Sequence, residues 1–130
     1  MTLRTRVVAL RTLRSGRAVG YAALHRADSD TRLATLPLGY ADGLPVSASN
    51  RGEVWIRGRR RPIVGRVSMD SSTIDVGDLP VEMGDEAVVF GAESGAPRVE
   101  EAAAAAGTLS YELLTRVGTR VPRRIRDRER

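Results

Sequence analysis

Short runs of alternating apolar and polar residues fill most of the first 90 positions of this chain, and turn-forming residues interrupt them at close intervals. Alternation with a period of two is typical of a β-strand that buries one face. Glycine, proline, asparagine and aspartate between such runs favour tight turns. The strands that this pattern predicts cover residues 2–13, 18–24, 31–38, 53–57, 61–68, 72–76 and 85–90. Short strands joined by frequent turns indicate a β-barrel or a β-sandwich.

Two pairs of these runs have the spacing of β-hairpins. Residues 18–24 and 31–38 are separated by a polar stretch whose Asp and Ser residues favour a turn. Residues 53–57 and 61–68 lie on either side of Gly58. A glycine between two strands readily adopts the left-handed backbone conformation that short hairpin turns need. We therefore expect each pair to be antiparallel neighbours.

The pattern changes after Pro97, where helix-forming residues replace the alternation. Residues 99–106 are mostly alanine and glutamate, which favour a helix, and Gly107 follows at a position where a left-handed residue commonly ends one. Residues 111–117 predict a second short helix, which Ser110 would cap.

Residues 119–125 are a candidate for a final strand before a charged tail. With 130 residues the chain is long enough for one domain with a single core. We predict one domain over residues 1–130 that is mostly β: a closed, Greek-key-like barrel with one or two short helices near the C-terminus.

Missing residue types exclude several kinds of chemistry. The chain has no cysteine and a single histidine, His25, so it forms no disulfide and we expect no metal site. It has no lysine either, because all 21 basic residues are arginine. Arginine stays protonated, so no side chain here can form a Schiff base with an aldehyde cofactor. No apolar run approaches the roughly 20 residues that span a bilayer, and we expect a soluble, cytoplasmic protein with no membrane partner.

The formal charge of +5 would suit an acidic partner such as nucleic acid. The arginines are nevertheless spread along the chain, and aromatic residues make up only 4% of it. Proteins that bind single strands place aromatic side chains between their basic residues for base stacking. We expect no nucleic-acid partner; the alternative predicts an affinity for DNA or RNA that falls steeply with salt.

Two glycine-containing runs end in side chains suited to contact a ligand. The first reads Gly-Tyr-Ala-Asp-Gly at residues 39–43, and the second reads Pro-Ile-Val-Gly-Arg-Val-Ser-Met-Asp at residues 62–70. Glycines beside a tyrosine allow a sharp turn and a close approach of the backbone to a ligand. Met69 followed by Asp70 is an unusual end for a plain loop, although Asp70 would also suit a loop cap or a residue that orients a neighbour.

The chain has only three tyrosines, Tyr21, Tyr40 and Tyr111, and each lies beside a glycine or at a predicted helix start. A phenol has a pKa near 10, and a neighbouring arginine favours the phenolate, so any of the three could serve as a base. The structural alternative is an aromatic residue at the rim of the core whose hydroxyl is hydrogen-bonded.

Three runs, at residues 34–43, 62–70 and 120–123, occur in the order and spacing of one enzyme family. Through these runs the chain resembles the C-terminal domain of the alanine racemases over nearly its whole length, starting at Thr2. The resemblance implies a mostly β barrel. It also implies interconversion of L- and D-alanine on pyridoxal 5′-phosphate, which supplies D-alanine for peptidoglycan.

In that family a lysine and a tyrosine act as bases on opposite faces of the substrate. Tyr21 matches the tyrosine of the L-face, because it lies nineteen residues before Tyr40, as in the family. Met69 resembles the residue whose backbone N–H meets the substrate carboxylate, with Asp70 beside it. Tyr40 and Tyr111 resemble two tyrosines that narrow the approach to the site, and Tyr111 also resembles a contact to the cofactor phosphate.

The chain departs from the family pattern in small and large ways. Ala22 replaces a usual glycine, Ser68 a common cysteine and Ser71 a common glutamine, while Arg66 matches a family arginine whose role we leave open. The large departure is that the N-terminal α/β barrel, which carries the Schiff-base lysine, has no counterpart here.

The resemblance implies a homodimer in which the barrel of one subunit and the C-terminal domain of the other share each site. We therefore expect this chain to be a fragment or a separately encoded domain that is inactive alone and holds no cofactor covalently. The alternative is a non-catalytic binding or docking module of the same fold. Whether the parent enzyme prefers alanine or serine stays open.

Overall fold

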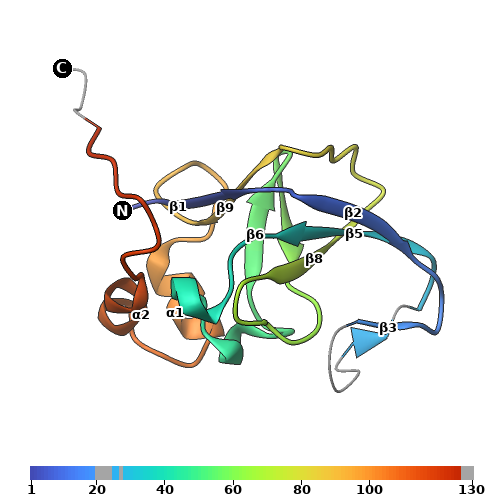
Figure 1. Cartoon of the computed structure of the whole chain (residues 1–130), viewed down its shortest axis with the longest axis horizontal. Coiled ribbons are helices and arrows are strands. Elements are labelled where there is room, and N and C mark those ends of the chain that lie inside the picture. Colours follow the sequence, from blue (N-terminus) through green and yellow to red (C-terminus); the bar gives the residue numbers. More distant parts are fainter. Residues whose placement is uncertain (20–24, 27, 127–130) are drawn as a thin grey trace.

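The computed structural model describes residues 1–19, 25–26 and 28–126 of the chain. Figure 1 shows a β-rich body with α1 and α2 packed together near one end of it. The elements in chain order are β1 (Leu3–Arg6), β2 (Ala9–Leu13), β3 (Ala18–Val19), β4 (His25–Arg26), β5 (Thr31–Leu36), the 3-10 helices η2 (Tyr40–Asp42) and η3 (Val46–Ala48), β6 (Glu53–Ile56), β7 (Arg59–Pro62), β8 (Ser72–Gly77), β9 (Glu86–Phe90), α1 (Val99–Ala105) and α2 (Ser110–Arg116). Within these described ranges, the helices are too short to cross a membrane.

The described strands form antiparallel sheets with the orders β1-β9-β6-β7, β2-β5-β8 and β3-β4. An isolated bridge between Ile63, just after β7, and Ile74 in β8 joins the edges of the first two sheets. The mostly β prediction is confirmed. The pairings between these strands do not close one barrel, so barrel closure stays a prediction.

The first alternating run contributes to two sheets instead of forming one strand over residues 2–13. Val7 donates its N–H to Asp85 O, whereas Val8 donates its own to Thr35 O. The chain thus changes partners between β1 and β2. The alternation alone could not reveal this, because both strands keep a period of two.

One predicted hairpin is confirmed and the other is wrong. β6 pairs with β7 across Arg57 and Gly58, which both have positive φ (49° and 74°), as short hairpin turns require. β5 pairs with β2 and β8, while β3 pairs with β4. Residues 20–24, the rest of the strand expected at 18–24, lie outside the described residues.

The strand predicted for residues 61–68 ends at Pro62, and a loop follows. Gly65 has a φ of 74°, and its N–H donates to Asn50 Oδ1 at 2.7 Å. The Val67 N–H donates to Ser49 Oγ at 2.8 Å. These bonds go to side chains of the segment after η3, so both N–H groups are satisfied without a strand partner, whereas the Val64 N–H still donates to Thr73 O in β8.

Both predicted helices are present, and Gly107 follows α1 with a φ of 70°, as expected. Leu109, not Ser110, is the N-cap of α2. No strand forms over residues 119–125, where the Arg123 guanidinium instead donates to the Val117 and Gly118 carbonyls at the end of α2.

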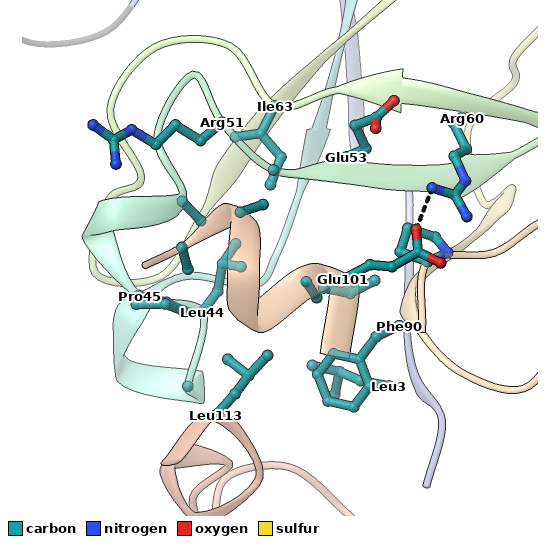
Figure 2. Close-up of a pocket in the computed structure, with 18 residues that line it drawn as sticks. Leu3, Leu44, Pro45, Arg51, Glu53, Arg60, Ile63, Phe90, Glu101 and Leu113 are labelled. Atoms are coloured by element: carbon teal, nitrogen blue, oxygen red, sulfur yellow. Dashed lines mark hydrogen bonds and ion pairs between the residues drawn. The ribbon is translucent and has the colours of Figure 1, made fainter. Parts of the chain in front are cut away.

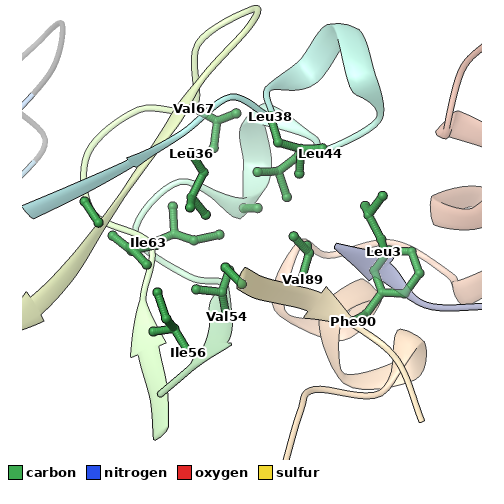
Figure 3. Close-up of a cluster of buried hydrophobic side chains, with 14 of the residues drawn as sticks. Leu3, Leu36, Leu38, Leu44, Val54, Ile56, Ile63, Val67, Val89 and Phe90 are labelled. Carbon is green, nitrogen blue, oxygen red and sulfur yellow. The ribbon is translucent and has the colours of Figure 1, made fainter. Parts of the chain in front are cut away.

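The hydrophobic core draws on the sheets, the loops and both helices (Figure 3). Leu36 and Phe90 come from strands and are at most 1% exposed. Leu38, Leu44 and Val67 come from the segments that carry the two glycine-containing runs. Burial of one such side chain stabilises the fold by about 1.5–3 kcal/mol, so the core holds both runs in place.

Candidate functional site

The backbones of the two glycine-containing runs are hydrogen-bonded to each other. The Tyr40 N–H donates to Ser68 O at 3.0 Å, and the Ala41 N–H donates to Met69 O at 2.9 Å. The side chains of Tyr40 and Met69 remain exposed, at 45% and 52%. The structure therefore brings together Tyr40, Met69 and Asp70, three residues that the sequence proposed for the site.

Gly39 makes this close approach possible. A Cβ at this position would lie 2.2 Å from Ser68 O and 2.5 Å from Met69 O, both backbone atoms. Its φ of −137° is open to any residue, so the requirement for glycine is one of space.

The other end of the run meets α2. Gly43 has a φ of 110°, and a Cβ there would lie 2.7 Å from Arg116 O. Between the two glycines, Asp42 Oδ2 accepts the Gly39 N–H at 3.0 Å and closes the η2 turn. The carboxylate of Asp42 is almost completely buried.

The third run reaches the same place through Arg120. Its Nη2 donates to Asp70 Oδ1 at 2.8 Å, and its Nε lies 3.3 Å from Asp42 Oδ1. The hydrogen bond to Asp70, followed by the charge of Asp42, raises the pKa of Arg120 above its ordinary value. One guanidinium thus connects all three runs. Nothing in the sequence near Arg120 identifies these partners, so its role is visible only in the folded chain.

Shallow depressions lie on either side of Tyr40. Besides Tyr40, one is lined by Arg66, Val67, Ser68 and Met69, and the other by Gly43, Pro45, Val46, Ser47 and Arg116. Arg66, whose role the sequence left open, is therefore a neighbour of Tyr40 and Met69. Among the described residues nothing accepts the backbone N–H of Met69.

Of the other two predicted site residues, one lies outside the described part of the chain and the other shows no contact with this cluster. Tyr21 lies outside the described residues. Tyr111 is in the first turn of α2 and is 80% exposed, and no described contact links it to Tyr40 or Met69. No group of His, Cys, Asp and Glu within the described ranges could hold a metal ion.

A separate pocket of about 120 Å³ lies between α1, α2 and the strands (Figure 2). Its wall is mostly apolar, with Leu3, Phe90 and Leu113 on one side, and the ion pair between Arg60 and Glu101 crosses its rim at 2.6 Å. We interpret this pocket as a packing gap next to the helices.

The family model described as the C-terminal domain of alanine racemase matches residues 1–125. The chain belongs to the alanine racemase family. It is 48% identical to the alanine racemase of Frankia casuarinae over 125 residues, which are 95% of this chain and 33% of that protein. The chain thus spans about a third of the length of the curated alanine racemases it matches.

Solved alanine racemase structures share the fold. The alanine racemase of Streptomyces lavendulae, a bacterium that produces D-cycloserine, superposes on this chain with a TM-score of 0.90. The two are 45% identical, and the match covers 93% of this chain and 32% of that one. The enzyme from Bartonella henselae, which carries covalently bound pyridoxal phosphate, gives a TM-score of 0.84 at 34% identity over 92% of this chain and 33% of that one.

Proposed function

We propose that this C-terminal alanine racemase domain supplies one wall of a site that interconverts L- and D-alanine with pyridoxal phosphate. The observation that supports this most is the junction of residues 39–43 with residues 68–70. It places the exposed residues Tyr40 and Met69 together with a Met69 backbone N–H that has no acceptor among the described residues. The match to the family does not by itself show that these groups lie together.

The Met69 N–H is suited to a substrate carboxylate. Hydrogen bonds from backbone N–H groups to an anion are short and strong, and this N–H has no acceptor among the described residues. In this proposal the Met69 N–H holds the carboxylate, Asp70 orients the peptide, and Tyr40 excludes water from one side.

The residues present suit contact with the cofactor but not its covalent attachment. The sequence contains no lysine to form a Schiff base, whereas Tyr111 offers an exposed phenol that could donate to a phosphate oxygen. When bound, pyridoxal phosphate acts as an electron sink and so makes the proton on the substrate α-carbon removable. We propose that Tyr111 contacts the phosphate and that the lysine comes from the barrel domain of a partner subunit in a homodimer.

Tyr21 is the proposed base on the L-face. A phenol with its ordinary pKa near 10 is protonated at neutral pH, so an adjacent cation must lower its pKa before it can accept a proton. In one direction the Tyr21 oxygen removes the proton, and in the other it returns it.

A chimera tests this proposal. The C-terminal third of the Frankia casuarinae enzyme, which is 48% identical to this chain, is replaced by residues 1–125. We expect the chimera to convert L-alanine to D-alanine, as measured by chiral chromatography. Tyr21→Phe should lower kcat by about 10²–10⁴-fold, the usual contribution of a general base. The exposed Met83 lies outside the site residues named above, so Met83→Leu is the control and should leave kcat unchanged.

Two results would contradict the proposal. An unchanged rate in Tyr21→Phe would remove Tyr21 from catalysis. Racemisation by this polypeptide alone, with added pyridoxal phosphate, would show that it is not merely one wall of a shared site.

The alternative is a docking module that kept the fold without a catalytic role. It predicts that the chain binds a separate lysine-bearing barrel domain in gel filtration but does not restore activity to it. Restoration of activity in trans would decide for the shared site. If the chimera racemises serine faster than alanine, the proposed reaction type stands but the proposed substrate is wrong.

A further inference from the structure

We infer that Arg120 is a positioning residue, which fixes Asp70 and the adjoining Met69 peptide against the Tyr40 turn and thereby sets how tightly the site binds a carboxylate. This inference rests on the proposed function for its substrate, but its geometric part can be tested without activity.

The Asp70 side chain depends on Arg120 for its contact more than the Asp42 side chain does. The Asp42 carboxylate has a second partner, the Gly39 N–H. Among the described residues, the side chain of Asp70 has Arg120 alone as a partner. Loss of the guanidinium should therefore leave η2 closed and release Asp70.

The peptide units before and after Met69 are each held through a carbonyl oxygen, because Ser68 O accepts the Tyr40 N–H and Met69 O accepts the Ala41 N–H. The Met69 N–H, on the first of these units, has no acceptor in the described part of the chain. Arg120 anchors the residue that follows, so the segment is fixed on both sides of the Met69 carbonyl. A donor held in one orientation binds an anion with a smaller loss of conformational entropy.

Charge gives a second reason for this role. Asp42 and Asp70 place two carboxylates beside a donor proposed to bind a third, and Arg120 is the cation that pairs with both of them in the described residues. Arg116, on α2, pairs with Glu112 instead. Without Arg120, two uncompensated negative charges would repel an incoming carboxylate.

A role in stability alone does not account for this arrangement. The side chains of Arg120 and Asp70 are 54% and 63% exposed, and the buried Asp42 carboxylate keeps the Gly39 N–H as a partner when Arg120 is lost. Ion pairs as exposed as this one contribute little to folding. The loss of Arg120 should therefore change the site far more than the fold.

The first experiment compares Arg120→Gln with Arg57→Gln by backbone amide NMR on the whole chain. Arg57 makes a bidentate pair with Asp85 and is 41% exposed, so it is a matched surface arginine away from the three runs. We expect Arg120→Gln to shift the amide signals of residues 68–70, with a melting temperature close to that of Arg57→Gln. Arg57→Gln should leave the signals of residues 68–70 in place. If Arg120→Gln also leaves them in place, the inference is overturned.

The second experiment measures kinetics in the Frankia chimera. Arg120→Gln should raise KM for alanine about fivefold, which corresponds to loss of one exposed ion pair, with a smaller change in kcat. Arg120→Lys should bring KM part of the way back to the value with Arg120, because an ammonium keeps the charge but cannot span both carboxylates. A fall in kcat at constant KM would contradict the inference. An inactive chimera with Arg120 intact would instead contradict the proposed function, and the NMR comparison would still decide the role of Arg120.

Discussion

Gly39 and Gly43 enclose the same turn, yet each is required for a different physical reason. Gly39 has an ordinary backbone conformation and lacks a Cβ because two carbonyl oxygens of the second run occupy that space. Gly43 is both left-handed and pressed against the end of α2. A conformational argument alone would have found only Gly43.

Gly39→Ala should lower the free energy of unfolding by about 3 kcal/mol, the upper range for overpacking at a tight contact. The clash is with backbone oxygens, which no rotamer change can relieve. Gly84→Ala is the control: Gly84 has a φ of 86° and open space around it, so only the left-handed conformation should cost about 1 kcal/mol. Urea denaturation measures both. Equal losses in the two variants would contradict the role given to Gly39.

Tyr40, Met69 and Asp70 can be proposed for the site from the sequence, whereas Arg120 cannot. The first three lie in runs whose glycines and unusual endings are visible locally. Arg120 is an arginine among 21, and its hydrogen-bond partner Asp70 is 50 residues away. Only folding brings such partners together, so no local signal could have identified this contact.

At the scale of elements, α1 shows how composition shapes packing. Alanine has the highest helix propensity, which explains why residues 99–105 form a helix in this short segment. Its small side chains, including Ala102 and Ala105, also fill little space against the strands. The pocket of about 120 Å³ in Figure 2 lies along this alanine face.

Ala102→Leu should raise the free energy of unfolding by about 1 kcal/mol, since it fills part of this pocket without loss of helix propensity. The control is Ala104→Leu on the same helix, where the residue is exposed and the change should be near zero. Thermal denaturation of both variants is the measurement. If Ala102→Leu melts below Ala104→Leu, the pocket is too tight for the larger side chain.

The error over residues 61–68 has a clear physical cause. Ile63, Val64 and Val67 are buried, and so they resemble a strand in sequence, but they belong to a loop that folds onto the core. A pattern of apolar residues indicates which side chains are buried, but not which backbone groups are hydrogen-bonded to each other. The runs at β6, β8 and β9 were predicted well because their burial and their pairing coincide.

For the whole molecule, ion pairs spread over the surface neutralise part of the positive charge. Arg4 pairs with Glu86 and Glu93, and Arg61 pairs with Asp75. Such pairing agrees with the expectation of no nucleic-acid partner, which stays a prediction to be checked by the salt dependence of binding.

Two other ion pairs, Arg57 with Asp85 and Arg60 with Glu101, should make the free energy of unfolding depend on pH in the acid range. The hydrogen bond from Arg57 lowers the pKa of Asp85 below 3.8, and that from Arg60 lowers the pKa of Glu101 below 4.5. A carboxyl with a lowered pKa in the folded state stabilises it above the unfolded pKa, and this contribution is lost as the pH falls through the folded value. The free energy of unfolding should therefore fall as the pH drops below about 4.5.

The variant Arg57→Gln/Arg60→Gln tests this contribution. Its free energy of unfolding, measured by urea denaturation from pH 7 to pH 3, should decline less steeply in the acid range than that of the unmodified chain. Identical slopes would show that these pairs do not couple protonation to folding. The double variant Arg11→Gln/Arg59→Gln is the control, because both side chains are exposed and neither makes an ion pair with a described residue.

The sequence by itself determined the family, the β character, both helices and the runs that form the candidate site. These features depend on local propensity, on periodicity and on motifs that lie within a few residues. Only the tertiary structure decided that the first run divides between two sheets, that residues 61–68 are mostly loop, and that Arg120 joins Asp42 to Asp70. Those outcomes depend on which distant backbone and side-chain groups can satisfy one another at the lowest free energy, and only the folded chain as a whole settles that competition.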